Sequence, residues 1–285
     1  MRSLTFVLIA SLAASLAVTS LAGPEPIADS SKETPVIAQK EVVECKWYVE
    51  IGGGADFEFG DTQFNRGHSL NTFFREVTLD FDAHNFDDVY DTPYHIKGEV
   101  GYAVSDYVEF FGNFSYSAAD GGSTSGGHFG FFSSDLSFKD EWGDYTSYGG
   151  QLGLRFFFLS RQSHFRPFIS LAGGASHVDS IGLKMKATSD FGPFLAGDTI
   201  FDGSFYGDST VATASILAGL EFNFTHCFAI GADAGATWQS KLSGDDGDLE
   251  RFDFLRFNLS GIHKLNDNAG DRLYCPVNFY AKFYF

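Results

Sequence analysis

The sequence predicts an all-β protein, an eight-stranded antiparallel up-and-down transmembrane β-barrel, on three observations. The composition combines 32 Gly and 33 Phe with only 2 Met in 285 residues, which disfavours helices and favours strands and turns. Apolar and polar side chains alternate with period two along eight segments. Short and long connections also alternate between these segments, as they do in outer-membrane barrels.

The predicted barrel spans residues 45–285, and two segments precede it. Residues 1–22 have the layout of a cleaved signal peptide, with a basic Arg2, an apolar run rich in Leu and Ala, and small residues before Gly23. Residues 23–44 contain three prolines among polar residues, and we expect a flexible periplasmic tail there. The chain is therefore expected to be exported.

The first predicted strand, 47–59, carries Glu50, Asp56 and Glu58 on its polar face. The later strands share the same alternation and are expected at 94–104, 107–116, 148–158, 165–177, 212–224, 228–238 and 277–285. A tilted strand crosses a bilayer with about 9–11 residues, so these lengths suit transmembrane strands. Their opposite faces are small or mixed, with several glycines and a few charges, whereas a soluble sandwich would expose strongly polar faces.

The connections set the predicted topology. Short turns are expected at 105–106, 159–164 and 225–227, on the periplasmic side. Long, acidic connections rich in Gly, Asp, Ser and Asn are expected to be solvated extracellular loops, at 60–92, 118–144, 179–209 and 239–272.

Two segments inside the long loops, 73–83 and 252–261, also have strand patterns. Adding both to the barrel would give ten strands, but it would also move the 118–144 and 179–209 loops to the periplasmic side. We favour eight strands, with both segments protruding above the membrane.

Charge and size exclude two classes of function. The formal net charge is −18, and nucleic-acid binding needs clustered Lys and Arg, so we expect no nucleic-acid partner. An eight-stranded barrel is only wide enough for its own side chains, which argues against a wide channel.

The hairpin at 98–107 and the last strand, which ends at Phe285 with apolar residues at 277, 279, 281 and 283, resemble the small outer-membrane barrels of the OmpA/OmpX-like and opacity-protein type. The resemblance implies an outer-membrane location, contact with lipid and lipopolysaccharide, and recognition of the terminal Phe285 by the barrel-assembly machinery. The resemblance says almost nothing about activity. We expect a structural, adhesive or surface-contact role rather than an enzymatic one, with an extracellular ligand that the sequence does not identify.

Two other functions remain open. Asp80, Asp82 and His84 alternate along one predicted strand and resemble the Asp–Asp and Asp–His pairs of omptin proteases, which would make the protein an outer-membrane hydrolase. The other is a narrow solute pore. Ser163 and His164 could belong to a lipase-like site, but they fall in a predicted periplasmic turn, away from the outer leaflet.

Metal and cofactor signals are weak. Asp245, Asp246 and Asp248 could bind Ca²⁺, but they lack the spacing and closing Glu of an EF-hand loop, so a solvated turn is favoured. The eight His residues show no zinc-ligand spacing. We expect no catalytic residue, no bound metal and no cofactor.

The three cysteines leave one pairing open. Cys45 and Cys227 are both expected at the periplasmic rim and could form a disulfide, although the eighth strand lies between theirs. Cys275 is expected at the other end of the last strand, out of reach. Three free thiols are the favoured alternative.

Parity predicts a charged layer in the lumen. If the apolar face of every strand meets lipid, the inward set contains Glu50, Glu99, Glu109, Arg155, Glu221 and Lys282, all close to the short-turn end, with Lys97 and Asp233 higher. We expect ion pairs that block the bore, similar to the internal ion-pair gate of OmpA-like barrels. Because four carboxylates would meet two cations, we also expect either a raised carboxyl pKa or help from Lys97 and ordered water. Polar residues in separate water pockets are the alternative.

Overall fold

The computed structural model describes residues 45–59, 63–65, 68–71, 77–131, 134–190, 195–245 and 269–285. The predicted signal peptide and tail, the whole segment 252–261, and Asp246 and Asp248 lie outside the described residues. In the described part of the chain, no helix is long and apolar enough to cross a membrane.

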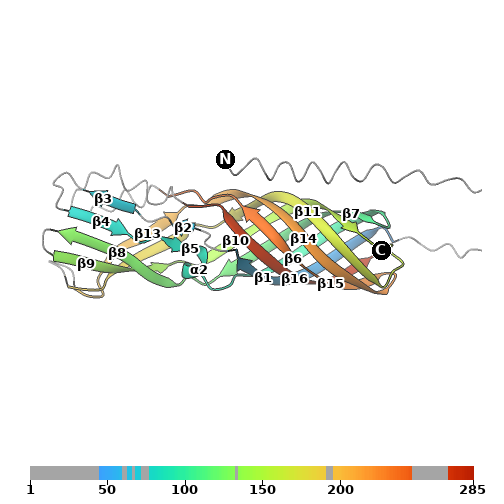
Figure 1. Ribbon diagram of the computed structural model, residues 1–285, viewed down its shortest axis with the longest axis horizontal. Helices are drawn as coiled ribbons and strands as arrows, with labels where there is room; N and C mark the ends of the chain where they lie inside the picture. Colours follow the sequence, from blue (N-terminus) through green and yellow to red (C-terminus); the bar gives the residue numbers. More distant parts are fainter. Residues whose placement is uncertain are drawn as a thin grey trace, which may run out of the picture. The chain divides into compact units, whose positions relative to one another are not determined.

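Eight antiparallel strands form a closed barrel in the order β1-β16-β15-β14-β11-β10-β7-β6 (Figure 1). Their bounds are β1 Trp47–Glu58, β6 Tyr94–Ser105, β7 Val108–Ala119, β10 Tyr145–Phe157, β11 Phe165–Val178, β14 Ser209–Thr225, β15 Phe228–Gln239 and β16 Arg272–Tyr284. The predicted eight-stranded barrel is confirmed, and the ten-stranded alternative is wrong. The barrel closes where β1 pairs with β16, with Glu50 opposite Lys282.

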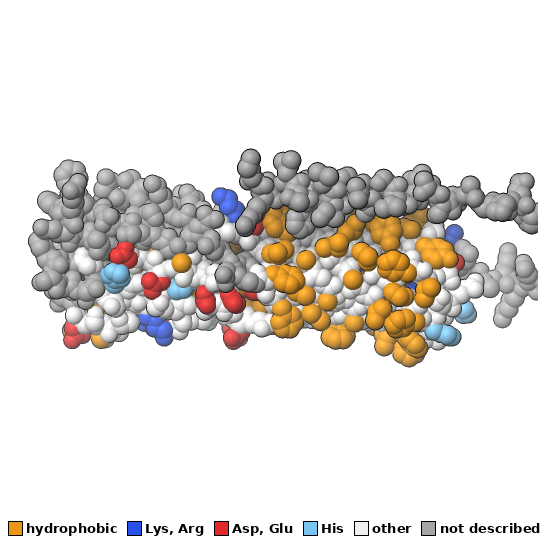
Figure 2. All heavy atoms as spheres, in the orientation of Figure 1, with side chains coloured by type: hydrophobic (Ala, Val, Ile, Leu, Met, Phe, Trp, Pro, Cys, Tyr) orange, Lys and Arg blue, Asp and Glu red, His pale blue; other side chains and the backbone are white. Residues whose placement is uncertain are grey.

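The outer face of the barrel is apolar. Ile51 is 69% exposed, Leu152 63% and Phe279 68%, and each lies near the middle of its strand. Figure 2 shows hydrophobic side chains gathered over the barrel strands, with charged side chains over the other part of the visible surface. Water would disfavour such a continuous apolar surface, whereas the interior of a lipid bilayer would accept it.

In the described residues, three of the four long connections form strands rather than the solvated loops that the sequence predicted; one of these strands, β4 (Val77–Phe81), lies within the segment 73–83 that was expected to protrude as a strand. They build a six-stranded sheet in the order β13-β12-β9-β8-β4-β3 and a small β2-β5 pair, at the end of the barrel opposite the short turns (Figure 1). Their bounds are β2 Gln63–Asn65, β3 His68–Asn71, β4 Val77–Phe81, β5 His84–Asn85, β8 Ser123–Phe131, β9 Ser134–Trp142, β12 Ile181–Ala187 and β13 Thr199–Tyr206, with a short helix α2 at Phe86–Val89. We call the six-stranded sheet the extracellular sheet, after the side of the membrane on which the sequence predicts the long connections to lie.

The extracellular sheet has its own hydrophobic core. Leu136, Phe138 and Trp142 alternate along β9 and are buried with Leu183 of β12 and Phe205 of β13. The same cluster includes the barrel residues Tyr145, Val178 and Val211. The core of the sheet is therefore continuous with the upper end of the barrel, and burial of these apolar side chains stabilises the arrangement.

Candidate functional site

Strand register gathers the charged lumen residues into one layer. Across neighbouring strands, Glu50 pairs with both Lys282 and Glu99. In the same way Arg155 is opposite Glu109, and Arg166 is opposite Glu221. Because paired residues in an antiparallel sheet point to the same face, all these side chains enter the lumen.

Arg155 is the centre of one half of the layer. Its Nη1 lies 3.0 Å from Oε2 of Glu50, and its Nη2 lies 3.1 Å from Oε1 of Glu99. Only 1% of Arg155 is exposed. The guanidinium carbon also lies 4.9 Å from the ring centroid of Phe168, within cation–π range.

Lys282 is the centre of the other half. Its Nζ lies 2.9 Å from Glu109 and 2.8 Å from Glu221, and Lys282 and both carboxylate residues are fully buried. The structure thus brings together all six residues that the sequence placed in the layer.

Arg166 is a seventh member, which the sequence analysis missed. It is fully buried, its Nη1 lies 2.8 Å from Oε1 of Glu221, and its Nη2 donates to the backbone carbonyl of Asp106 in a short turn. The sequence did contain a signal for this position. Arg166 lies three residues before Ile169 on the same strand, so its side chain points to the opposite face, and Ile169 faces outward. Lys97 also reaches the layer, with its Nζ 3.2 Å from Glu50. The layer therefore holds four carboxylates and four cations, a balance that the sequence analysis did not find.

Aromatic side chains fill the rest of this level. The hydroxyl of Tyr48 donates to Glu99 at 2.8 Å, and that of Tyr284 donates to Glu109 at 2.8 Å. Glycine is required where the rings lie flat against a strand: a Cβ on Gly101 would lie 2.3 Å from the Tyr48 ring, and one on Gly231 would lie 2.2 Å from the Tyr280 ring. This close approach explains the small inward residues in the sequence.

A second polar level lies above the charged layer. His95 Nδ1 lies 2.9 Å from Asp56 and its Nε2 contacts Asn278, whose amide donates to Asp233 at 2.6 Å. Asp56, His95 and Asn278 line a polar cavity of about 80 Å³. Arg272 also lines this cavity; its Nη2 lies 2.6 Å from Glu58, and its guanidinium lies over the ring of Phe86 of α2. The described side chains thus fill the bore at two levels.

The predicted hydrolase residues do not converge. β4 ends at Phe81, and His84 begins β5, which belongs to a different sheet. Asp80 pairs with His128 at 3.0 Å, Asp82 accepts a hydrogen bond from Ser125, and His84 is buried beside Trp142. The one-face arrangement that alternation predicted is wrong, because the strand ends before His84.

The remaining candidates are placed as follows. Ser163 and His164 lie in the turn between β10 and β11, and each contacts Asn223 through a backbone or ring atom, so they do not pair with each other as a nucleophile and base would. The Sγ atoms of Cys45 and Cys227 lie 3.6 Å apart, within thiol–thiol hydrogen-bond distance and not joined as a disulfide. The backbone amide of Asp245 donates a hydrogen bond to the carbonyl of Phe205.

A buried carboxyl group in the extracellular sheet has a strongly raised pKa. Asp140 occupies an inward position of β9 and is only 2% exposed. Burial, with a smaller contribution from the nearby Asp82, raises the pKa of Asp140 from 3.8 to about 7. The sequence offered a signal, since Asp140 interrupts the apolar series 136, 138 and 142.

No protein-family model matches the sequence, and no curated protein is similar to it in sequence. Among solved structures, Neisserial surface protein A is 11% identical, with 84% of this chain and 97% of that chain covered and a TM-score of 0.40. The outer membrane protein OprG of Pseudomonas aeruginosa is 12% identical, with 85% and 98% covered and a TM-score of 0.36. The outer membrane protease OmpT of Escherichia coli is 10% identical, with 85% and 98% covered and a TM-score of 0.35.

The class of the protein follows from its own strand pairing. A closed, eight-stranded antiparallel barrel with an apolar outer face and a polar lumen is the architecture of small outer-membrane β-barrel proteins.

Proposed function

We propose that the protein is an outer-membrane barrel closed to solutes, whose extracellular sheet serves as a rigid surface-contact platform. Its role is structural or adhesive. The observation that carries this proposal is the aromatic core of the sheet, which continues into the upper end of the barrel. A solvated loop needs no such core, whereas a surface that binds a partner gains affinity from being ordered beforehand.

The outer face supports the location. Exposed apolar side chains occur on every barrel strand, and aromatic ones occur at both ends, such as Phe57 and Tyr94 above and Tyr107 and Phe224 near the short turns. Aromatic girdles of this kind lie at the two membrane interfaces of outer-membrane barrels. The partners implied are membrane lipid and lipopolysaccharide.

The C-terminus supports assembly by the usual route. Phe285 is 65% exposed, and its backbone amide and carbonyl both bond to Trp47 of β1. Its side chain is thus free for the barrel-assembly machinery, while its backbone holds the closing pair of strands.

The two other functions have less support. A pore would need an open bore, but Arg155, Arg166 and Lys282 cross the lumen in ion pairs with the layer carboxylates. A hydrolase of the omptin type would need Asp80, Asp82 and His84 to converge, and His84 lies in a separate sheet.

The test compares bacteria that display the wild-type chain with bacteria that display a variant in which a short Gly-Ser linker replaces residues 123–142, the β8-β9 hairpin. Gel migration of unboiled and boiled outer-membrane fractions verifies that each barrel is folded. We expect the wild type to increase attachment to epithelial cells or matrix-coated surfaces, and the variant to lose the increase. Equal attachment of both, or no increase over cells without the protein, would contradict the contact role. Solute conductance of the wild type in planar bilayers would favour the pore.

A further inference from the structure

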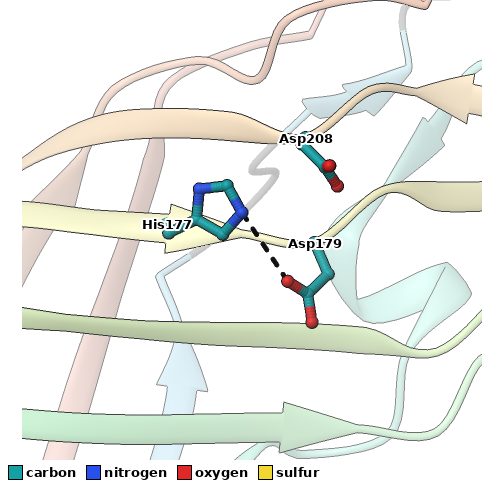
Figure 3. A group of neighbouring side chains, drawn as sticks. All are labelled: His177, Asp179 and Asp208. Atoms are coloured by element: carbon teal, nitrogen blue, oxygen red, sulfur yellow. Dashed lines mark ion pairs between the residues drawn. The ribbon is translucent and has the colours of Figure 1, made fainter.

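His177, Asp179 and Asp208 lie together on the outside of the barrel rim (Figure 3). His177 is near the end of β11, Asp179 follows that strand directly, and Asp208 precedes β14. Because Val178 is paired with Ser209, the strand register places the three residues side by side. None of them belongs to the charged layer of the lumen.

The spacing of the three side chains suits a metal ion. One ligand atom from each residue lies within 4.8 Å of the other two, and Nε2 of His177 is 3.7 Å from Oδ1 of Asp179. Two donors on opposite sides of an ion, each about 2.1 Å from it, are about 4.2 Å apart. Small side-chain rotations would therefore bring the three atoms into one coordination sphere.

Backbone contacts hold the three positions in place. The amide of Asp179 donates to the carbonyl of Thr146 at 3.0 Å, and the amide of Ser180 donates to Oδ1 of Asp208 at 2.8 Å. The ring of His177 packs on Tyr148, its cross-strand neighbour, with 5.1 Å between the centroids. A site whose residues are already held in position loses less entropy when it binds an ion.

Charge and location indicate what the site would contact. Among the described residues, neither Asp179 nor Asp208 forms an ion pair with Lys or Arg, and both are exposed. Tyr148 is 40% exposed on the outer face near the upper end of the barrel. If the apolar outer face is embedded in the membrane, the two carboxylates would lie near the lipid headgroup phosphates. Carboxylates and phosphates repel each other unless a cation lies between them.

We propose that His177, Asp179 and Asp208 bind one divalent transition-metal ion whose open coordination positions accept phosphate oxygens at the membrane surface. Imidazole with carboxylates suits Zn²⁺ or Mn²⁺, whereas Mg²⁺ prefers an all-oxygen shell. The phosphate contact rests on the proposed outer-membrane location, but the metal site does not. A cation held here would link the start of the β11-β12 connection to the turn before β14 and anchor the rim to the headgroup layer.

The first experiment tests the metal alone. Zn²⁺ binding to the full chain in neutral detergent is measured by calorimetry in phosphate-free buffer. We expect one strong site, weakened at least about tenfold in Asp179→Asn and in Asp208→Asn, and weakened also in His177→Ala. The matched control is Asp202→Asn, since Asp202 is an exposed carboxylate paired with Lys184 in the extracellular sheet. Unchanged binding in either Asn variant, or no strong site in the wild type, overturns the proposal whether or not the protein is a membrane barrel.

The second experiment tests the phosphate contact. Bound Mn²⁺ broadens the ³¹P signal of phosphates that it coordinates, so the signal is compared between the wild type and the Asp179→Asn/Asp208→Asn double variant. Broadening of the lipid signal in phosphatidylglycerol vesicles, only with the wild type, supports headgroup binding. Broadening only with inorganic phosphate in detergent supports the phosphate chemistry but overturns the headgroup contact. No difference with either source overturns the phosphate part.

Discussion

Replacing Arg155 with Ala tests the charged layer most directly. Arg155 is 1% exposed and lies within 3.1 Å of both Glu50 and Glu99. Its removal leaves those carboxylates with Lys97 as a nearby cation, 3.2 Å from Glu50 and 3.7 Å from Glu99. Breaking a buried pair by removing one partner costs about 3–5 kcal/mol, because the remaining charge is desolvated without compensation.

We therefore expect Arg155→Ala to lower the free energy of unfolding by about 3–5 kcal/mol, or to open a small-ion conductance as water enters the layer. Urea unfolding in lipid vesicles, followed by tryptophan fluorescence and gel migration, measures the first effect, and planar-bilayer recording measures the second. The Arg155→Ala/Glu50→Gln variant should recover part of the stability, since it leaves three carboxylates with three cations in the layer instead of four with three.

Lys184→Ala is the matched control. Lys184 forms an exposed ion pair with Asp202 at 3.1 Å, and such pairs contribute about 0–1 kcal/mol. If Arg155→Ala costs no more than this control and the bilayer stays silent, the charged layer is not a stabilising network and the reasoning fails.

Three further predictions follow from other parts of the chain. Deleting Phe285 should impair assembly and leave the chain to periplasmic degradation, as measured by its level in outer-membrane fractions; normal levels would contradict the assembly signal. In the folded protein the pKa of Asp140 is about 7, above its ordinary value of 3.8, so folding favours the protonated carboxyl group. The free energy of unfolding should therefore fall by up to about 4 kcal/mol as the pH rises from about 4 to 7, and then level off. Asp140→Asn should flatten this dependence in urea unfolding across pH, and an equally steep dependence in the variant would assign it to other groups. The Sγ atoms of Cys45 and Cys227 lie 3.6 Å apart, so the two thiols should form a disulfide by exchange with an added small disulfide, which is reduced to two thiols. Mass spectrometry should show that the protein has lost two hydrogens. Persistence of both free thiols after such oxidation would refute the pairing.

The barrel could be predicted from the sequence because its signal is local. Alternation along each strand fixes which side chains face lipid, as with Ile51 and Leu152, and the loop lengths fix which strands are neighbours. The same parity led to Glu50, Arg155 and Lys282 in the lumen. Arg166 was missed although the predicted strand 165–177 contains it and the same rule turns its side chain inward.

The extracellular sheet could not be predicted in the same way. β8 and β9 come from one connection, β12 and β13 from another, and β4 from a third, so their pairing is non-local. Alternation was present in 136–142 and 181–187, but the glycines and acidic residues around it also fit solvated loops. Whether these segments form a sheet or solvated loops depends on a shared hydrophobic core to which all three connections contribute.

The sequence by itself determined the strands of the barrel, the direction of their side chains and the presence of buried charges, since each of these depends on near neighbours along the chain. Only the tertiary structure decided which charges meet, that four cations balance four carboxylates, that Asp80, Asp82 and His84 separate, and that His177, Asp179 and Asp208 converge. The physical reason is that ion pairing and metal ligation require atoms within about 4 Å, and this proximity is set by strand register and packing between distant segments.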